Sequence, residues 1–218
     1  MFLMPGLIIA SYVTNTPLPE AHRTEMMRYL RNHQNADGGW GTHIESPNST
    51  MFGSVLNYVS MRLLGASAAE PMVAKARAFI KQHGGAVGTP SWGKFWLCVL
   101  GAFEWSGVNS LFPEMWLLPY FLPFHPGRYW CHCRMVYLPM SYLYGVRFVG
   151  PITPLVQSLR EEIFVEQYDQ IKWASIRSQV AIIDKYTPQA LVLKLIYAAL
   201  NAYEAMHIPA FRRKAVGT

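Results

Sequence analysis

One stretch bears most directly on the fold of this chain: Tyr29-Leu30-Arg31-Asn32-His33-Gln34-Asn35-Ala36-Asp37-Gly38-Gly39-Trp40. It runs from the end of an amphipathic helical segment into a sharp turn. Gly38 and Gly39 allow the positive φ angles that such a turn needs, and Asp37 can hydrogen-bond its own backbone. We expect Gln34 to reach back to free backbone groups while the indole of Trp40 packs beside it. Local physics alone therefore predicts a helix-ending turn with a buried tryptophan.

The rest of the chain is predicted as further helices that are joined by loops rich in glycine and proline. Caps at Asn48-Ser49-Thr50, Thr89-Pro90 and Thr187-Pro188 support these helices. No stretch shows sustained alternation of period two, so we predict an all-α protein. Several helices have little polar face, which favours a partial α/α barrel (toroid) over a four-helix bundle. The predicted helices are 20–33, 51–63, 69–82, 91–103, 133–148, 154–164 and 189–206.

The composition of the 218-residue chain excludes disorder. Hydrophobic residues make up 51% and charged residues 15%, whereas an ordinary soluble domain has about 25% charged residues. This apolar excess requires a cavity, a partner or a membrane. The net charge of +6 is scattered apart from Arg212-Arg213-Lys214. No nucleic-acid recognition motif accompanies it, so we expect no nucleic acid and favour anionic lipid headgroups as the partner of this surface.

Neither a disulfide framework nor a metal site is predicted from the three cysteines, Cys98, Cys131 and Cys133. A structural zinc site needs four ligands, usually as two separated pairs, and no second pair exists. We therefore expect no metal, no cofactor and a reducing compartment. The apolar run Met1–Val13 is interrupted by Pro5 and is too short to span a bilayer. It is predicted to be a buried helix or strand.

A second informative stretch is Tyr129-Trp130-Cys131-His132-Cys133-Arg134-Met135-Val136-Tyr137-Leu138-Pro139-Met140. It places aromatic rings, an imidazole and two thiols within nine residues, with Arg134 as its only charged side chain. Such a cluster suits a dry pocket that handles positive charge and one proton. From the residues alone, a core tryptophan and a hydrogen-bonded core histidine are favoured over this pocket, and the apolar run fits a buried core helix as well.

These motifs together resemble the N-terminal part of oxidosqualene cyclases, most closely the lanosterol synthase group. Gln34, Gly38 and Trp40, preceded by an aromatic residue and leucine, look like the QW repeat of triterpene cyclases. The likeness runs from Phe2 to about Arg213. Further matching stretches are Phe52-Gly53-Ser54-Val55-Leu56-Asn57-Tyr58-Val59-Ser60, Pro90-Ser91-Trp92-Gly93-Lys94-Phe95-Trp96 and Leu111-Phe112-Pro113-Glu114-Met115-Trp116.

The resemblance implies that residues 1–218 form a single partial domain of the N-terminal α/α barrel, without the catalytic C-terminal barrel. The implied reaction of the family is cyclisation of (S)-2,3-oxidosqualene to lanosterol or a related tetracycle by a cationic cascade. Aromatic faces hold the successive carbocations, and a dry cavity keeps water from capturing them.

The resemblance also implies roles for particular residues. Trp92 and Trp130 would line the cavity, and His132 would accept the last proton directly or through a tyrosine. An imidazole suits that step because its ordinary pKa is about 6.5. Cys133 and Tyr137, four residues apart on one helix face, would form the constriction between a membrane channel and the cavity.

The implied membrane contact lies in the segment Met135–Pro154, which would dip into one leaflet. The expected location is accordingly the cytoplasmic side of the endoplasmic reticulum membrane or a lipid droplet, as a monotopic protein.

The family's proton donor, an aspartic acid in an Asp-Cys-Thr-Ala-Glu stretch, has no counterpart here. The chain contains only Asp37, Asp169 and Asp184, and none lies in that context. A basic residue followed by a small one usually precedes the aromatic residue of the QW repeat, and this pair is not clearly present here. We therefore expect a gene-model fragment, a truncated gene product or one piece of a split cyclase, inactive without the missing C-terminal part.

Three alternatives remain open from the sequence. The chain could be a catalytically dead, lipid-binding or membrane-associated protein. It could belong to a hopene-type squalene cyclase, although the Trp130–Arg134 run resembles the oxidosqualene branch. A protein prenyltransferase β-subunit shares the toroid, but its zinc ligands have no counterpart.

Overall fold

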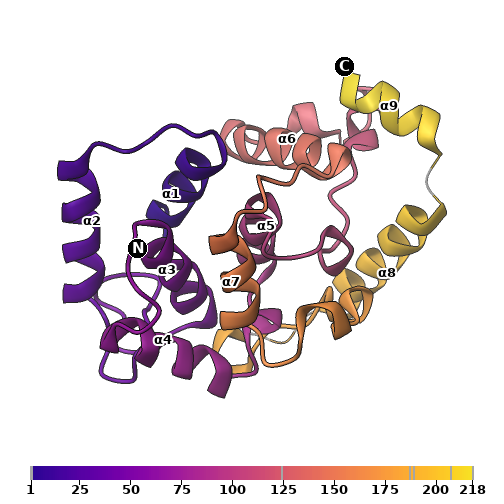
Figure 1. The fold of residues 1–218 in the computed structure, drawn as a ribbon. Helices are drawn as coiled ribbons and strands as arrows, with labels where there is room; N and C mark the ends of the chain where they lie inside the picture. Colours follow the sequence, from indigo (N-terminus) through magenta and orange to yellow (C-terminus); the bar gives the residue numbers. More distant parts are fainter. Residues whose placement is uncertain (1, 124, 187, 189, 207, 218) are drawn as a thin grey trace. The chain divides into compact units, whose positions relative to one another are not determined.

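The computed structural model describes residues 2–123, 125–186, 188, 190–206 and 208–217. Throughout these ranges every regular element is a helix, and one isolated antiparallel bridge joins Trp40 to Thr50. The predicted all-α class is confirmed (Figure 1). The chain divides into two compact units: unit 1 is Met1–Val108 with Val149–Thr187, and unit 2 is Asn109–Phe148 with Pro188–Thr218.

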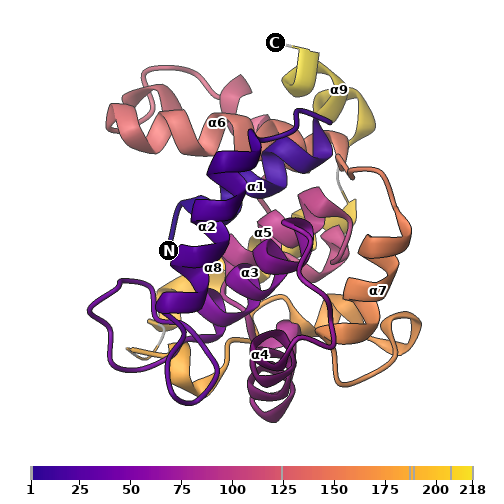
Figure 2. The ribbon, with the colours of Figure 1, turned by 60° about the vertical axis from the view of Figure 1, so that its left-hand side comes forward.

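Unit 1 is built around helix α3, Met51–Leu63. Every side chain from Met51 to Met61 is buried, as the lack of a polar face predicts. Helices α1, α4, α5 and α7 contact α3. In the rotated view of Figure 2, α2 and α1 lie at the front of this unit. The helices of unit 1 are α1 Met4–Val13, α2 Glu20–Asn32, α3, α4 Pro71–Gln82, α5 Ser91–Leu100 and α7 Pro154–Glu162.

In the turn after α2, Gln34 bonds to main-chain groups as predicted, but these lie ahead of it, in the turn and on α4, and not behind it. Gln34 Nε2 donates to the carbonyl oxygens of Gly38 at 2.8 Å and of Met72, on α4, at 2.9 Å. The fully buried indole of Trp40 donates from Nε1 to Leu30 O at 2.9 Å. The motif thereby joins α2 to α4 through main-chain acceptors.

The two glycines of this turn serve different purposes. Gly38 has φ +96°, as predicted. The expectation of a positive φ at Gly39 is wrong, because that residue is required by a close approach instead. A Cβ at Gly39 would lie 2.5 Å from Ser54 Oγ and 2.6 Å from Ser49 Cβ. Asp37 Oδ1 accepts from the amide of Gly39 at 2.9 Å, as its side chain was expected to do.

The N-terminus of α3 receives a cap that local sequence does not reveal. Thr50 accepts from Gly53 N at 2.9 Å, which confirms the predicted cap. In addition, Asp184 accepts from Met51 N at 2.6 Å and from Phe52 N at 2.9 Å. The side chain of Asp184 is buried at the end of the 3-10 turn Ile182–Asp184. Burial raises the pKa of this carboxyl, although the two amide donors oppose the shift.

Replacing this distant cap should weaken unit 1. We expect Asp184→Ala to lower the free energy of unfolding by about 3 kcal/mol, because two amides at a helix N-terminus lose a carboxylate acceptor. Urea unfolding followed by circular dichroism measures the change. Asp169→Ala, at an exposed aspartate, is the matched control and should shift stability by no more than about 0.5 kcal/mol. Equal shifts for the two variants would contradict the capping role.

Unit 2 contains α6 Cys131–Val146, α8 Leu191–Met206 and α9 Pro209–Gly217, with 3-10 turns η3 Pro113–Leu117 and η4 Pro126–Arg128. Ion pairs connect these elements. Arg212 Nε lies 2.6 Å from Glu114 Oε1, and Arg212 Nη2 lies 2.8 Å from Glu204 Oε2. Arg147 also pairs with Glu204 and stacks on the Tyr144 ring at 3.9 Å. Arg212 is therefore buried, and its assignment to a basic surface cluster is wrong.

Several predicted helix ends move for identifiable reasons. The helix predicted over 91–103 stops at Leu100 because Gly101 takes a left-handed φ of +89°. Thr89 is not its cap: Pro90 occupies the N-cap position, and Thr89 Oγ1 has no hydrogen-bond partner in the structure as described. The helix predicted over 133–148 runs from Cys131 to Val146 instead.

The remaining boundaries differ by one to a few residues. The helix predicted over 69–82 begins at Pro71, and the one predicted over 154–164 ends at Glu162. The cap predicted at Thr187 and the helix start predicted at Gln189 lie outside the described residues. The N-terminal run forms helix α1, with Pro5, Ile8 and Ile9 buried. Among the described residues, no helix has the length and apolarity to cross a membrane.

Candidate functional site

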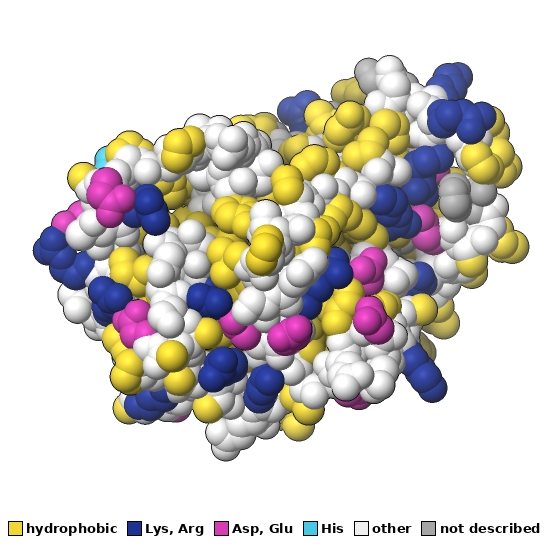
Figure 3. Space-filling model, viewed as in Figure 1, with side chains coloured by type: hydrophobic (Ala, Val, Ile, Leu, Met, Phe, Trp, Pro, Cys, Tyr) yellow, Lys and Arg dark blue, Asp and Glu magenta, His cyan; other side chains and the backbone are white. Residues whose placement is uncertain are grey.

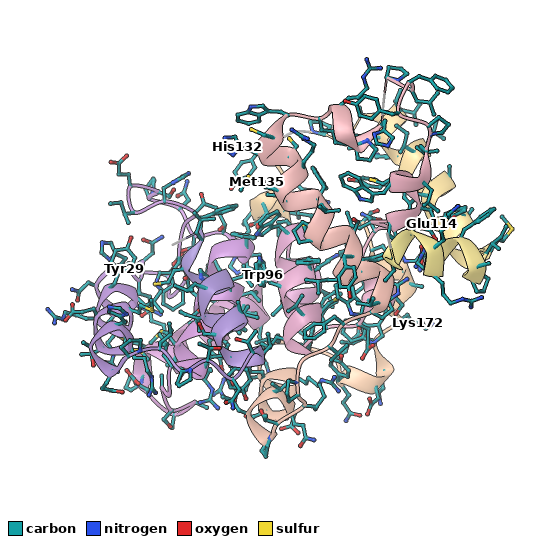
Figure 4. The ribbon with its side chains drawn as sticks, turned by 90° about the horizontal axis from the view of Figure 1, so that it is seen from above. Tyr29, Trp96, Glu114, His132, Met135 and Lys172 are labelled. Atoms are coloured by element: carbon teal, nitrogen blue, oxygen red, sulfur yellow. The ribbon has the colours of Figure 1, made fainter. Side chains whose placement is uncertain are left out.

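Four of the predicted site residues gather at the start of α6. Trp130 is its N-cap residue, and His132, Cys133 and Tyr137 lie on its first two turns. The preceding turn η4 directs the chain into this helix, and Figure 4 shows His132 and Met135 near its N-terminal end. The local sequence spacing alone brings these side chains together, because all four belong to one helix and its cap.

The imidazole of His132 and the indole of Trp130 are in direct contact. Their ring centroids lie 4.4 Å apart with an interplanar angle of 77°, which is an edge-to-face arrangement. Both side chains are exposed, Trp130 by 69%. The contact restricts how the imidazole can turn.

Cys133 and Tyr137 share the same face of α6, as their four-residue spacing predicts. Cys133 is half-buried, and Tyr137 is 43% exposed. Cys131 is exposed and lies two residues away, which places it near the opposite side of the helix. Over the described parts of the chain, no group of three or more His, Cys, Asp or Glu side chains is placed to hold a metal ion.

Trp92 belongs to the other compact unit. It lies half-buried on α5, and its ring stacks on Phe2 at a centroid distance of 6.3 Å. Phe2 in turn contacts Phe52 of α3 at 5.1 Å. Trp92 is therefore the edge of an aromatic stack in unit 1, whereas Trp130 and His132 form a pair in unit 2.

The loop that leads into α6 is organised by a histidine that sequence reasoning missed. His125 is buried, and its Nδ1 accepts from Gly127 N at 2.9 Å. The centroid of its ring lies 6.4 Å from that of Trp116 and 5.2 Å from that of Tyr120. The sequence signal was a histidine directly before Pro126-Gly127, a pair that favours a tight turn. The turn fixes the direction from which the chain enters α6.

Exposed hydrophobic side chains cover α6 and this loop, and we call them the α6 surface. Figure 3 shows hydrophobic and basic side chains side by side in the part drawn as α6 and α9 in Figure 1. Arg128 and Arg134 lie among them. The α6 surface consists of Tyr120, Phe121, Tyr129, Trp130, Met135, Tyr137, Leu138, Tyr142 and Val146.

A buried lysine in unit 1 was also missed. Lys94 is 1% exposed, and its ammonium donates to the carbonyl oxygens of Ile176 at 2.6 Å, Gln179 at 2.9 Å and Arg177 at 3.3 Å. Burial lowers its pKa to about 8. Its acceptors are more than 80 residues away in sequence, so no local pattern indicates them. The lysine fixes the segment after α7.

The chain matches the family described as squalene-hopene cyclase N-terminal domain over residues 6–218. It is 53% identical to cycloartenol synthase of Dictyostelium discoideum over 217 residues, which are 99% of this chain and 31% of that protein. It is 52% identical to lanosterol synthase of Homo sapiens and 46% identical to protostadienol synthase A of Neosartorya fischeri. Each of these matches covers 99% of this chain and 29% of the relative. The chain thus spans less than a third of the length of these curated relatives.

Proposed function

The chain belongs to the squalene-hopene cyclase N-terminal domain family, which has the helical terpene-cyclase fold, and we propose that it forms the N-terminal part of an oxidosqualene cyclase. The observation that carries this proposal is identity at about half of all positions, over 99% of the chain, with proteins named cycloartenol and lanosterol synthase. The reaction proposed for the whole enzyme is cyclisation of oxidosqualene to a tetracyclic sterol precursor.

The residues at the start of α6 suit the late steps of such a reaction. Trp130, 69% exposed in this chain, offers a π-system to a carbocation, and the attraction is strongest where the rest of the enzyme keeps water from the ring. His132, in edge contact with that ring at 4.4 Å, accepts the proton that ends the cascade, directly or through a tyrosine. For Trp92, at the edge of the aromatic stack of unit 1, the resemblance suggests a cation-binding role of the same kind.

None of the three aspartates has the surroundings of an acid that could start the reaction. Asp37 is bonded to Gly39 N and Ser49 Oγ in its turn. Asp184 holds the amides of α3, and Asp169 is exposed on the 3-10 turn Tyr168–Gln170. A general acid must be protonated and aimed at the substrate. We therefore propose that the epoxide is protonated by a residue beyond these 218, and that this chain alone does not catalyse cyclisation.

An exchange experiment tests this function. The segment of human lanosterol synthase that aligns with this chain is replaced by it, and the chimera is expressed in yeast that lacks lanosterol synthase. We expect the chimera to support growth and the 218-residue chain alone to form no cyclised product from oxidosqualene. A stable chimera that forms no tetracycle, although the chain alone binds squalene-like lipids, would favour the lipid-binding alternative.

We further propose that Cys133 and Tyr137 narrow the path of the substrate. We also propose that the α6 surface contacts one leaflet of the endoplasmic reticulum membrane or a lipid droplet. Basic side chains beside exposed apolar ones suit a monotopic contact. Met135, 71% exposed, and Leu138, 50% exposed, lie on the same helix half.

Charges on the α6 surface should weaken this membrane contact. We expect Met135→Glu to lower the affinity of the chain for vesicles containing phosphatidylserine by about tenfold, because an apolar side chain no longer leaves water. Co-sedimentation measures the affinity. Ile44→Glu is the control, since Ile44 is 58% exposed in a loop of unit 1. If both variants bind vesicles like the parent chain, the α6 surface is not the membrane contact.

A further inference from the structure

Helix α6 consists of two halves with opposite environments, separated by Pro139. In the half 131–138 no side chain is buried, and Met135 and Leu138 are at least 50% exposed. In the half 140–146, Met140, Ser141 and Tyr144 are buried. The second half is therefore part of the core of unit 2, whereas the first half projects from it.

The buried half is fixed by close packing and by charge. A Cβ at Gly145 would lie 2.8 Å from both Pro113 Cγ and Val216 Cγ2, so η3 and α9 press against this glycine. At its end, Arg147 stacks on the Tyr144 ring at 3.9 Å and pairs with Glu204. Any rotation between the two halves must consequently move the first half.

The backbone between the halves is weakened at one point. Pro139 has no N–H, so the carbonyl of Met135 loses its helical donor, and the proline ring crowds that carbonyl. The buried hydroxyl of Ser141 hydrogen-bonds to the peptide group of Leu138, directly before Pro139. Ser141 Oγ donates to Leu138 O at 2.9 Å and accepts from Trp116 Nε1 at 3.1 Å. Ser141 thereby connects the carbonyl just before the proline to the indole on η3.

We propose that Pro139 is a hinge within α6, and that Ser141, held by Trp116, is a positioning residue that sets the direction of the helix half carrying Cys133 and Tyr137. The hydroxyl fixes the peptide plane of Leu138, and that plane determines how the first half leaves the core. The consequence for the substrate path rests on the proposed function, whereas the hinge itself does not.

Hydrogen exchange of the backbone amides in 131–138, measured on the 218-residue chain, tests the hinge. We expect Ser141→Ala to speed exchange about fivefold, the equivalent of one lost hydrogen bond. We expect Pro139→Ala to slow exchange, because the new N–H restores the bond to Met135 O. Opposite signs at neighbouring positions distinguish a hinge from general loss of packing, which would speed exchange in both variants.

Three further variants sharpen the test. Ser141→Thr keeps the hydroxyl and should return exchange to the parent rate. Trp116→Phe removes the Nε1 donor, keeps a ring, and should act like Ser141→Ala, which preserves the test if the serine variant does not fold. Ser60→Ala is the matched control, because Ser60 is a buried serine that donates to Leu56 O at 2.8 Å in α3. It should leave 131–138 unchanged.

The outcomes separate the hinge from the proposed function. Changes of equal sign in Ser141→Ala and Pro139→Ala, or no change in either, overturn the hinge and leave the chimera experiment unaffected. If the chimera is inactive but hydrogen exchange in 131–138 is still faster in Ser141→Ala and slower in Pro139→Ala, the hinge is supported. Only its role in substrate entry is then contradicted. The rate of alkylation of Cys133 divided by that of Cys131 gives an independent measurement, and this ratio of rates should rise in Ser141→Ala.

Discussion

A chimeric cyclase that carries His132→Ala is expected to form its tetracyclic product about 10²–10⁴ times more slowly than the parent chimera. In the proposed reaction, the cascade ends when a base removes a proton from the last carbocation. The base proposed here is the imidazole of His132, whose ring centroid lies 4.4 Å from that of Trp130, the ring proposed to attract the cation. Alanine removes the base and leaves the ring in place.

Gas chromatography of the products from oxidosqualene measures both the rate and the product spectrum. Without its proton acceptor the cation loses protons at other positions, so we expect a mixture of alkenes. A folding defect would instead lower all products alike. His22→Ala, at an exposed histidine of α2, should change the rate less than about twofold. If His132→Ala retains more than half of the parent rate with one product, His132 is not the acceptor.

The parts of the fold that were predicted correctly depend on neighbours in sequence. The hydrogen bond from Gln34 to Gly38 in the turn and the Thr50 cap of α3 are each formed within a few residues. The same holds at the start of α6, where the placement of Cys133 and Tyr137 on one face follows from helical periodicity. Short-range hydrogen bonds and periodicity are recorded directly in the order of residues.

The missed features depend on partners that are far apart in the chain. Asp184 caps a helix more than 130 residues before it, and Lys94 binds carbonyls more than 80 residues after it. Arg212 looks like part of a surface cluster until Glu114 and Glu204 enclose it. A charged residue is predicted to be exposed unless its partner is known, because burial without a partner is costly. The roles of Trp92 and Trp130 likewise came from resemblance, not from local pattern.

Glu162→Ala is expected to lower the free energy of unfolding of unit 1 by about 3 kcal/mol, since removing Glu162 leaves the half-buried guanidinium of Arg62 without its counter-charge. Glu162, at the end of α7, accepts from Tyr58 Oη at 2.6 Å and from Arg62 at 2.9 and 3.0 Å. Ser158 also donates to it. These contacts join α7 to α3 across 100 residues of sequence.

Urea unfolding at pH 7 measures this loss. Glu161→Ala is the matched control, because its side chain is exposed on the same turn and should contribute less than about 0.5 kcal/mol. The double variant Arg62→Met with Glu162→Met should recover part of the loss, since it removes both charges together. A Glu162→Ala chain as stable as the Glu161→Ala chain would show that the cluster does not stabilise unit 1.

The difference in unfolding free energy between the parent chain and Glu162→Ala should also become smaller in acid. Burial acts to raise the pKa of Glu162, but hydrogen bonds from Arg62, Ser158 and Tyr58 outweigh burial and lower it below the ordinary 4.5. A carboxyl with a lowered pKa stabilises the folded state above about pH 4.5 and loses this contribution as the pH falls through its folded value. Asp184 has a raised pKa and gives a dependence of opposite sign, but it is present in both chains and cancels in their difference. A difference in unfolding free energy that stays constant from pH 7 to pH 3 would therefore mean that Glu162 is not held as a carboxylate by its three donors.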